Sequence, residues 1–190
     1  MNNPFDIGDQ TFRNLLKKAL KDCKSYMVGF AELNEIFGVT PNTKNYSEIL
    51  SKAAEQKISK AISEFTNKDS KYTTNDLDSD IVVNQNIPVE VKVSSGTEWM
   101  AGEFTDRPYW HILIRRDKTD NEYNKYFVCL IKMKNEYWKS TIYRNHYGAT
   151  FDKKALFKLK EEGTADLHII FGDIVQSKKS CKFILETLNI

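Results

Sequence analysis

Two carboxylates and an amine stand close together in the segment SDIVVNQNIPVEVKVSSG, residues 79–96. Asp80 precedes a short apolar run, and Glu90 and Lys92 alternate with valines in a second run that follows a polar turn. Residues two apart on a strand share a face, so Glu90 and Lys92 point the same way while the valines point into a core. Asp80 begins the neighbouring strand and is expected to lie beside Glu90.

This group of side chains suits chemistry on phosphate esters. Mg²⁺ is held in proteins by one or two carboxylates, several waters and substrate phosphate oxygens. The ion polarises a phosphate and lowers the pKa of a bound water. A nearby lysine can orient that water and stabilise the developing charge. Asp80, Glu90 and Lys92 therefore predict hydrolysis of a phosphodiester, with Mg²⁺ as the cofactor.

The same residues resemble the PD-(D/E)xK nuclease motif, in which an acidic residue on one strand is followed by (D/E)-x-K on the next. Asp80 matches the first acid, Glu90 the second and Lys92 the lysine. Ser79 stands where the family usually has proline, and Asp78 is an alternative first acid. The chain holds five (D/E)-x-K patterns, but only this one lies on an alternating apolar strand that follows another acid-bearing strand.

The resemblance implies further site residues. In the family, a helix before the hairpin often supplies another glutamate, for which Glu55 is preferred and Glu48 is the alternative. The carbonyl of Val91 is expected to add a metal ligand. The sequence after the lysine is similar to that of some bacterial type II restriction endonucleases. The residues that carry this similarity are Ser95, Gly96, Trp99 and Gly102.

The resemblance also implies an activity and partners. It predicts a Mg²⁺-dependent endonuclease that acts on double-stranded DNA, most closely a type II restriction enzyme. Because a palindromic site is matched by a two-fold protein, a homodimer is expected. Two alternatives stay open: a repair or junction-resolving nuclease of the same fold, and a DNA-binding subunit without catalytic activity.

Cations and aromatic side chains of the second half predict where DNA binds. The net charge is only +2, but the second half of the chain is the more basic one. Arginines contact phosphates and base edges, and aromatic rings stack or pack. The predicted DNA-binding residues are Arg107, Arg115, Arg116 and Trp99.

The elements that must position these residues follow from periodicity. Helices are predicted at 9–23, at about 30–37 with its end at Gly38, at 46–65 and at 152–160. Strands are predicted at 81–83, 89–93, 109–114, 126–133, 137–143 and 167–171, with a loop at 94–108 and a helix or a strand at 179–188. This order indicates a mixed α/β (α+β) class. The resemblance implies, more narrowly, a restriction-endonuclease-like central mixed sheet flanked by helices. A single domain spanning residues 1–190 is expected, with a helical N-terminal region (1–66), a catalytic hairpin and sheet (78–133) and a C-terminal region (134–190).

Composition limits the setting. No apolar run approaches the length of a membrane span, and the first ten residues lack the apolar core of a secretory signal. The three cysteines are far apart, which favours a reduced, cytoplasmic protein over a disulfide framework.

Overall fold

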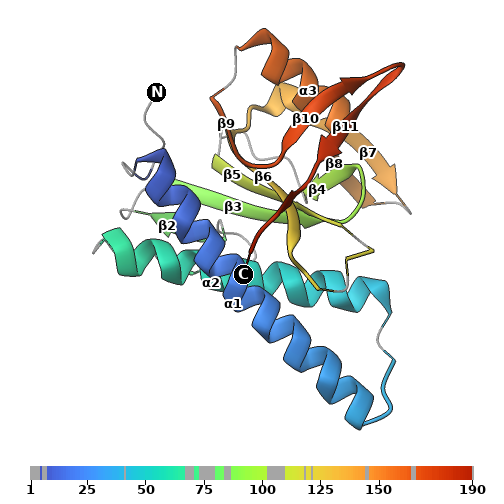
Figure 1. Cartoon of the computed structure of the whole chain (residues 1–190). Coiled ribbons are helices and arrows are strands. Elements are labelled where there is room, and N and C mark those ends of the chain that lie inside the picture. The colour runs from blue at the N-terminus through green and yellow to red at the C-terminus, as the bar shows by residue number, and fades with distance from the viewer. Residues whose placement is uncertain are drawn as a thin grey trace.

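The computed structural model combines helices with a mixed sheet, as the sequence predicts (Figure 1). It describes residues 5, 8–40, 42–66, 71–72, 80–83, 87–101, 110–117, 119–120, 122–143, 146–163 and 166–189. Three α-helices lie within these ranges. Among them, no helix has both the length and the apolar character needed to cross a bilayer.

The N-terminal region is a pair of long helices, α1 (Asp9–Ile36) and α2 (Thr43–Thr66). The two helices predicted within 9–37 are one continuous helix, because the buried stripe runs on from Cys23 to Met27 one turn later. The predicted end at Gly38 is confirmed: this residue has a φ of 63°, which favours glycine. Both helices pack against each other and against the sheet.

The central sheet has the strand order β1-β2-β3-β5-β6-β12, and β9 also pairs with β6. Its strands are β1 (Lys71–Tyr72), β2 (Ile81–Val83), β3 (Ile87–Ser94), β5 (Trp110–Arg116), β6 (Lys125–Lys132), β9 (Leu167–Phe171) and β12 (Glu186–Thr187). The pair β3 and β5 is parallel, and the other pairs are antiparallel. The sheet is therefore mixed, as predicted.

Smaller elements cover the other face of this sheet (Figure 1). They are the three-stranded sheet of β4 (Glu98–Ala101), β8 (His146–Asp152) and β7 (Lys139–Tyr143), the short helix η1 (Asn135–Tyr137), the helix α3 (Lys153–Glu162) and the hairpin of β10 (Asp173–Ser177) and β11 (Ser180–Ile184). One prediction is corrected here, and one that left a helix and a strand open is decided. The predicted loop 94–108 contains β4, which pairs with β8, and the segment 179–188 forms strands rather than a helix.

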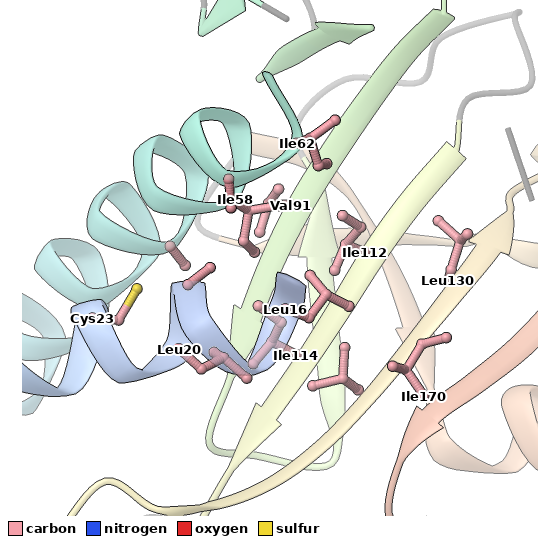
Figure 2. Close-up of a cluster of buried hydrophobic side chains, with 14 of the residues drawn as sticks. Leu16, Leu20, Cys23, Ile58, Ile62, Val91, Ile112, Ile114, Leu130 and Ile170 are labelled. Atoms are coloured by element: carbon pink, nitrogen blue, oxygen red, sulfur yellow. The ribbon is translucent and has the colours of Figure 1, made fainter. Parts of the chain in front are cut away.

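Each face of the central sheet has its own hydrophobic core. Figure 2 shows the first core, where α1 and α2 pack on the face that carries Val91, Ile112 and Ile114. Leu113 lies between the latter two on β5 and belongs to the second core, beneath the smaller elements. This alternation fixes which side of β3 and β5 each polar residue occupies. Val89 and Val91 are fully buried in the first core, so Glu90 and Lys92 face the other side.

Candidate active site

The site lies where the pairing between β2 and β3 ends. The last pair in the register is Ile81 with Val89, so no β2 residue stands opposite Val91. The side chain of Asp80 takes that place: its Oδ2 accepts a hydrogen bond of 2.8 Å from the Val91 N–H. The N–H and C=O groups of one strand residue point to the same edge. The Val91 carbonyl is therefore directed to the edge that Asp80 occupies.

Lys92 joins the two predicted carboxylates. Its Nζ lies 2.5 Å from Glu90 Oε2 and 3.5 Å from Asp80 Oδ2. The three side chains are 24, 17 and 16% exposed for Lys92, Glu90 and Asp80 respectively, so the cluster is partly withdrawn from water but still reachable from it. The structure thus brings together the three residues that carry the sequence pattern.

Glu55 approaches the cluster from α2. Its side chain is only 6% exposed, and its Oε2 accepts a hydrogen bond of 3.1 Å from Lys52 Nζ. Burial raises the pKa of Glu55, and the negative charge of Asp80 raises it further, which places the two carboxyls within electrostatic reach. The alternative residue, Glu48, is solvent-exposed. Lys52 was not predicted, although its position three residues before Glu55 is the spacing of a helical ion pair.

The cluster contains more carboxylates than cations. Burial raises the pKa of Asp80, and the nearby Glu90 adds to this, against the lowering effects of Lys92 and the Val91 N–H. Burial alone would lower the pKa of Lys92, but Glu90, Asp80 and Glu55 together raise it. Lys92 is therefore held as an ammonium, and the three carboxyls are matched by only two ammoniums, Lys92 and the largely exposed Lys52 that pairs with Glu55. Such a group attracts a further cation.

The donor set suits a magnesium ion whose remaining ligands are water molecules and phosphate oxygens of the substrate. Within the described ranges, no three or more Asp, Glu, His or Cys side chains are arranged to enclose a metal ion. Asp80 and Glu90, with the Val91 carbonyl, are instead a partial set that leaves positions for water and phosphate oxygens. Mg²⁺ is commonly held in this way, so the residues present fit the ion.

The predicted DNA-binding residues are separated by the fold. Arg115 lies on the same face of the sheet as Glu90 and Lys92, because its partner in the parallel register is Ser94. Arg116 follows on the opposite face and is 7% exposed.

Trp99 is 1% exposed, and its indole N–H donates to the Ile114 carbonyl at 3.0 Å, which gives it a packing position away from solvent. Asp78 and Arg107 lie outside the described residues, as do Ser79 and Gly102.

Sequence comparison with known proteins identifies no family for this chain. No protein-family model matches the chain, and no curated protein matches it in sequence. The functional interpretation therefore depends on the residues and their geometry.

Proposed function

We propose that this protein is a Mg²⁺-dependent endonuclease that hydrolyses phosphodiester bonds of double-stranded DNA. The observation that supports this best is the convergence of Glu90, Asp80 and Lys92 at the open edge of β3, with Lys92 Nζ 2.5 and 3.5 Å from the two carboxylates. Paired carboxylates with an adjacent ammonium are suited to a phosphate group, because the carboxylates hold a cation and the ammonium faces a negatively charged substrate.

Each residue has a distinct role in this proposal. Asp80 and Glu90, with the Val91 carbonyl, would hold Mg²⁺. When bound, Mg²⁺ supplies a Lewis acid that polarises the phosphate and makes a water more acidic. Lys92, whose raised pKa keeps it protonated, donates hydrogen bonds to the attacking water or to a phosphate oxygen rather than accepting a proton. Glu55 adds negative potential from α2 and is a positioning residue.

We further propose that the enzyme cuts at a defined sequence, as type II restriction enzymes do. Cutting both strands of a palindrome requires two equivalent sites, which a homodimer provides. Sedimentation of the protein with a cleavable duplex would test this: a two-to-one complex is expected, and a one-to-one complex on a palindromic site would contradict it. The alternatives are a structure-directed repair or junction-resolving nuclease and a non-catalytic DNA-binding subunit.

One cleavage assay separates these possibilities. Plasmid DNA of known sequence is incubated with the protein in Mg²⁺ or in EDTA, and the products are resolved on a gel. We expect discrete fragments in Mg²⁺ and none in EDTA. Cleavage of branched but not linear duplexes would support the junction-resolving alternative, and DNA binding without cleavage would support the non-catalytic one.

A matched pair of variants assigns the activity to the site. Glu90→Gln removes a carboxylate next to Lys92, whereas Glu162→Gln removes one from the exposed pair of Lys158 and Glu162 on α3, where the charges are 3.6 Å apart. We expect cleavage to be lost with Glu90→Gln and kept with Glu162→Gln. Equal cleavage by both variants would mean that the activity belongs to another region of the chain.

A further inference from the structure

The guanidinium of Arg115 is only partly buried, but two of its nitrogens have no hydrogen-bond partner among the described residues. Its guanidinium carbon lies 5.1 Å from the centroid of the Phe183 ring on β11. Its Nε and Nη1 are buried, and neither has a hydrogen-bond acceptor among the described residues. The carboxylate two residues along, Asp117, accepts from the backbone N–H and the hydroxyl of Thr119 at 2.9 and 2.7 Å. Arg115 therefore lies on an aromatic ring, and no anionic side chain in the described ranges accepts a hydrogen bond from its Nε or Nη1.

The other described arginines differ from Arg115 in this respect. Arg13 donates to the Ile170 carbonyl and forms an ion pair with Glu186. Arg116 is bonded weakly to the Asp117 carbonyl, at 3.5 Å. Leaving buried donors of a charged group unpaired is costly, because the water they lose is not replaced. Burial accordingly lowers the pKa of Arg115, which Asp117 offsets only in part.

The position of Arg115 connects it with the candidate active site. In the parallel register, Glu90 stands beside His111, Lys92 beside Leu113 and Ser94 beside Arg115. Arg115 is thus on the face of the sheet that carries Lys92, two residues or about 6.6 Å further along the strands. The Ser94 hydroxyl donates to the Glu98 carbonyl at 2.6 Å and accepts from the Gly96 N–H, and neither buried nitrogen of Arg115 donates to it.

We propose that Arg115 binds a backbone phosphate of the DNA strand, next to the phosphodiester that lies at Lys92, by swinging from the Phe183 ring to the phosphate. The inference rests on the proposed nuclease function and adds the residue that sets the position of the DNA strand relative to Lys92. A guanidinium offers a planar pair of donors that matches two phosphate oxygens. Phosphates repeat at regular intervals along a DNA strand. A cation near Lys92 that binds one phosphate therefore fixes which neighbouring phosphodiester reaches Lys92.

This role is one of positioning. A bound phosphate would supply acceptors for the two nitrogens that have none among the described residues, so the cost of burying these donors is offset when DNA binds. Replacing Arg115 should therefore weaken DNA binding and raise KM, while kcat at saturating DNA stays within a few-fold. In the absence of DNA, the same replacement should make the protein more stable rather than less.

The test compares Arg115→Met with Arg13→Met, which removes the same charge from a paired arginine. Binding to a double-stranded oligonucleotide is measured by fluorescence anisotropy in Ca²⁺ over a range of NaCl concentrations, and Tm is measured in EDTA. We expect Arg115→Met to weaken binding about tenfold, to reduce the salt slope by about one and to raise Tm by about 2 °C or more. Arg13→Met should lower Tm and change the affinity by less than about twofold.

The outcomes separate this inference from the proposed function. If the wild-type protein binds DNA and Arg115→Met binds it equally well, Arg115 is not a phosphate-binding residue. A lower Tm for Arg115→Met than for wild type would contradict the inference in the same way. If wild-type protein binds no DNA, the proposed function fails, and this inference fails with it. The effect of inorganic phosphate on Tm is measured separately in EDTA. If phosphate raises Tm only when Arg115 is present, but DNA binding does not depend on Arg115, the residue binds a free anion and the proposal is overturned.

Discussion

The tripeptides Glu90-Val91-Lys92 and Asp152-Lys153-Lys154 share one acid-x-lysine pattern and use it in different ways. On β3, the two charged side chains point to one face, and Lys92 Nζ lies 2.5 Å from Glu90 Oε2. At the start of α3, Asp152 is the N-cap, and it is the backbone N–H of Lys154, not its side chain, that donates to the carboxylate at 2.9 Å. The secondary structure decides whether the lysine side chain meets the acid.

The two regions also differ in how well their carboxylates are satisfied. Asp152 accepts from two backbone N–H groups at the start of α3 and from Lys139 Nζ at 2.5 Å. Burial would raise the pKa of Asp152, but the Lys139 hydrogen bond and these N–H groups lower it overall. The pKa of Asp80 is raised instead, by burial and then by Glu90. The N-cap is thus complete without a ligand, whereas the β3 cluster has an excess of carboxylate that a cation can balance.

The largest expected difference between the regions is in catalysis. Asp80→Asn and Glu90→Gln should each reduce Mg²⁺-dependent cleavage about 100-fold or more, because each removes a charge proposed to hold the ion. Asp152→Asn should leave the cleavage rate within about twofold. Initial rates on one plasmid substrate, with folding checked by circular dichroism, measure this. Normal cleavage by folded Asp80→Asn would shift the first acid to Asp78.

The next effect concerns stability. Asp152→Ala should lower the free energy of unfolding by about 1 kcal/mol, because two N–H groups at the start of α3 lose their acceptor. For a chain of this size the expected fall in Tm is about 2–4 °C. Urea unfolding followed by circular dichroism measures the change. An unchanged midpoint would mean that water replaces the cap at no cost.

Asp80→Asn should have the opposite or no effect on stability in EDTA. The raised pKa of Asp80 means that folding favours its neutral form, which an amide resembles, and the Asn side-chain oxygen can still accept from the Val91 N–H. The free energy of unfolding should either rise or stay within about 0.5 kcal/mol of the wild-type value. A loss as large as that of Asp152→Ala would show that the two carboxylates are equally structural.

The smallest expected effect is the pH dependence of the N-cap. The pKa of Asp152 is lower in the folded protein than its ordinary value, so its charged form stabilises the fold above that value. The contribution is lost as the pH falls through the folded pKa. The difference in unfolding midpoint between wild type and Asp152→Asn should therefore shrink below about pH 4. A difference that stays constant into acid would exclude the charge of Asp152 as its cause.

Features set by local pattern could be predicted from the sequence. The stripe of 46–65, the strands 81–83 and 167–171 and the glycine after the first helix depend on periodicity and on turn chemistry, and they agree with the structure. Placing Glu90 and Lys92 on one face needed only the alternation of a strand. The placement of Asp80 beside them needed only the hairpin.

Features set by tertiary packing could not be predicted from the sequence. The strand β4 lies in a polar segment and is stabilised by pairing with β8, more than forty residues later. The burial of Trp99 and the contact of Arg115 with the Phe183 ring depend on what covers each face of β5. The burial that raises the pKa of Asp80 depends on packing from the rest of the fold, and no local pattern predicts that two buried nitrogens of Arg115 have no acceptor among the described residues.

The two lysines of the shared pattern give the most direct test of the proposed site. Lys92→Met and Lys154→Met each remove one ammonium two residues after an acid, and only the former lies between Glu90 and Asp80. A cleavage time course in Mg²⁺ on the same plasmid DNA should show almost no product with Lys92→Met and wild-type product with Lys154→Met. Wild-type cleavage by folded Lys92→Met would contradict the proposal that this cluster carries out phosphodiester hydrolysis.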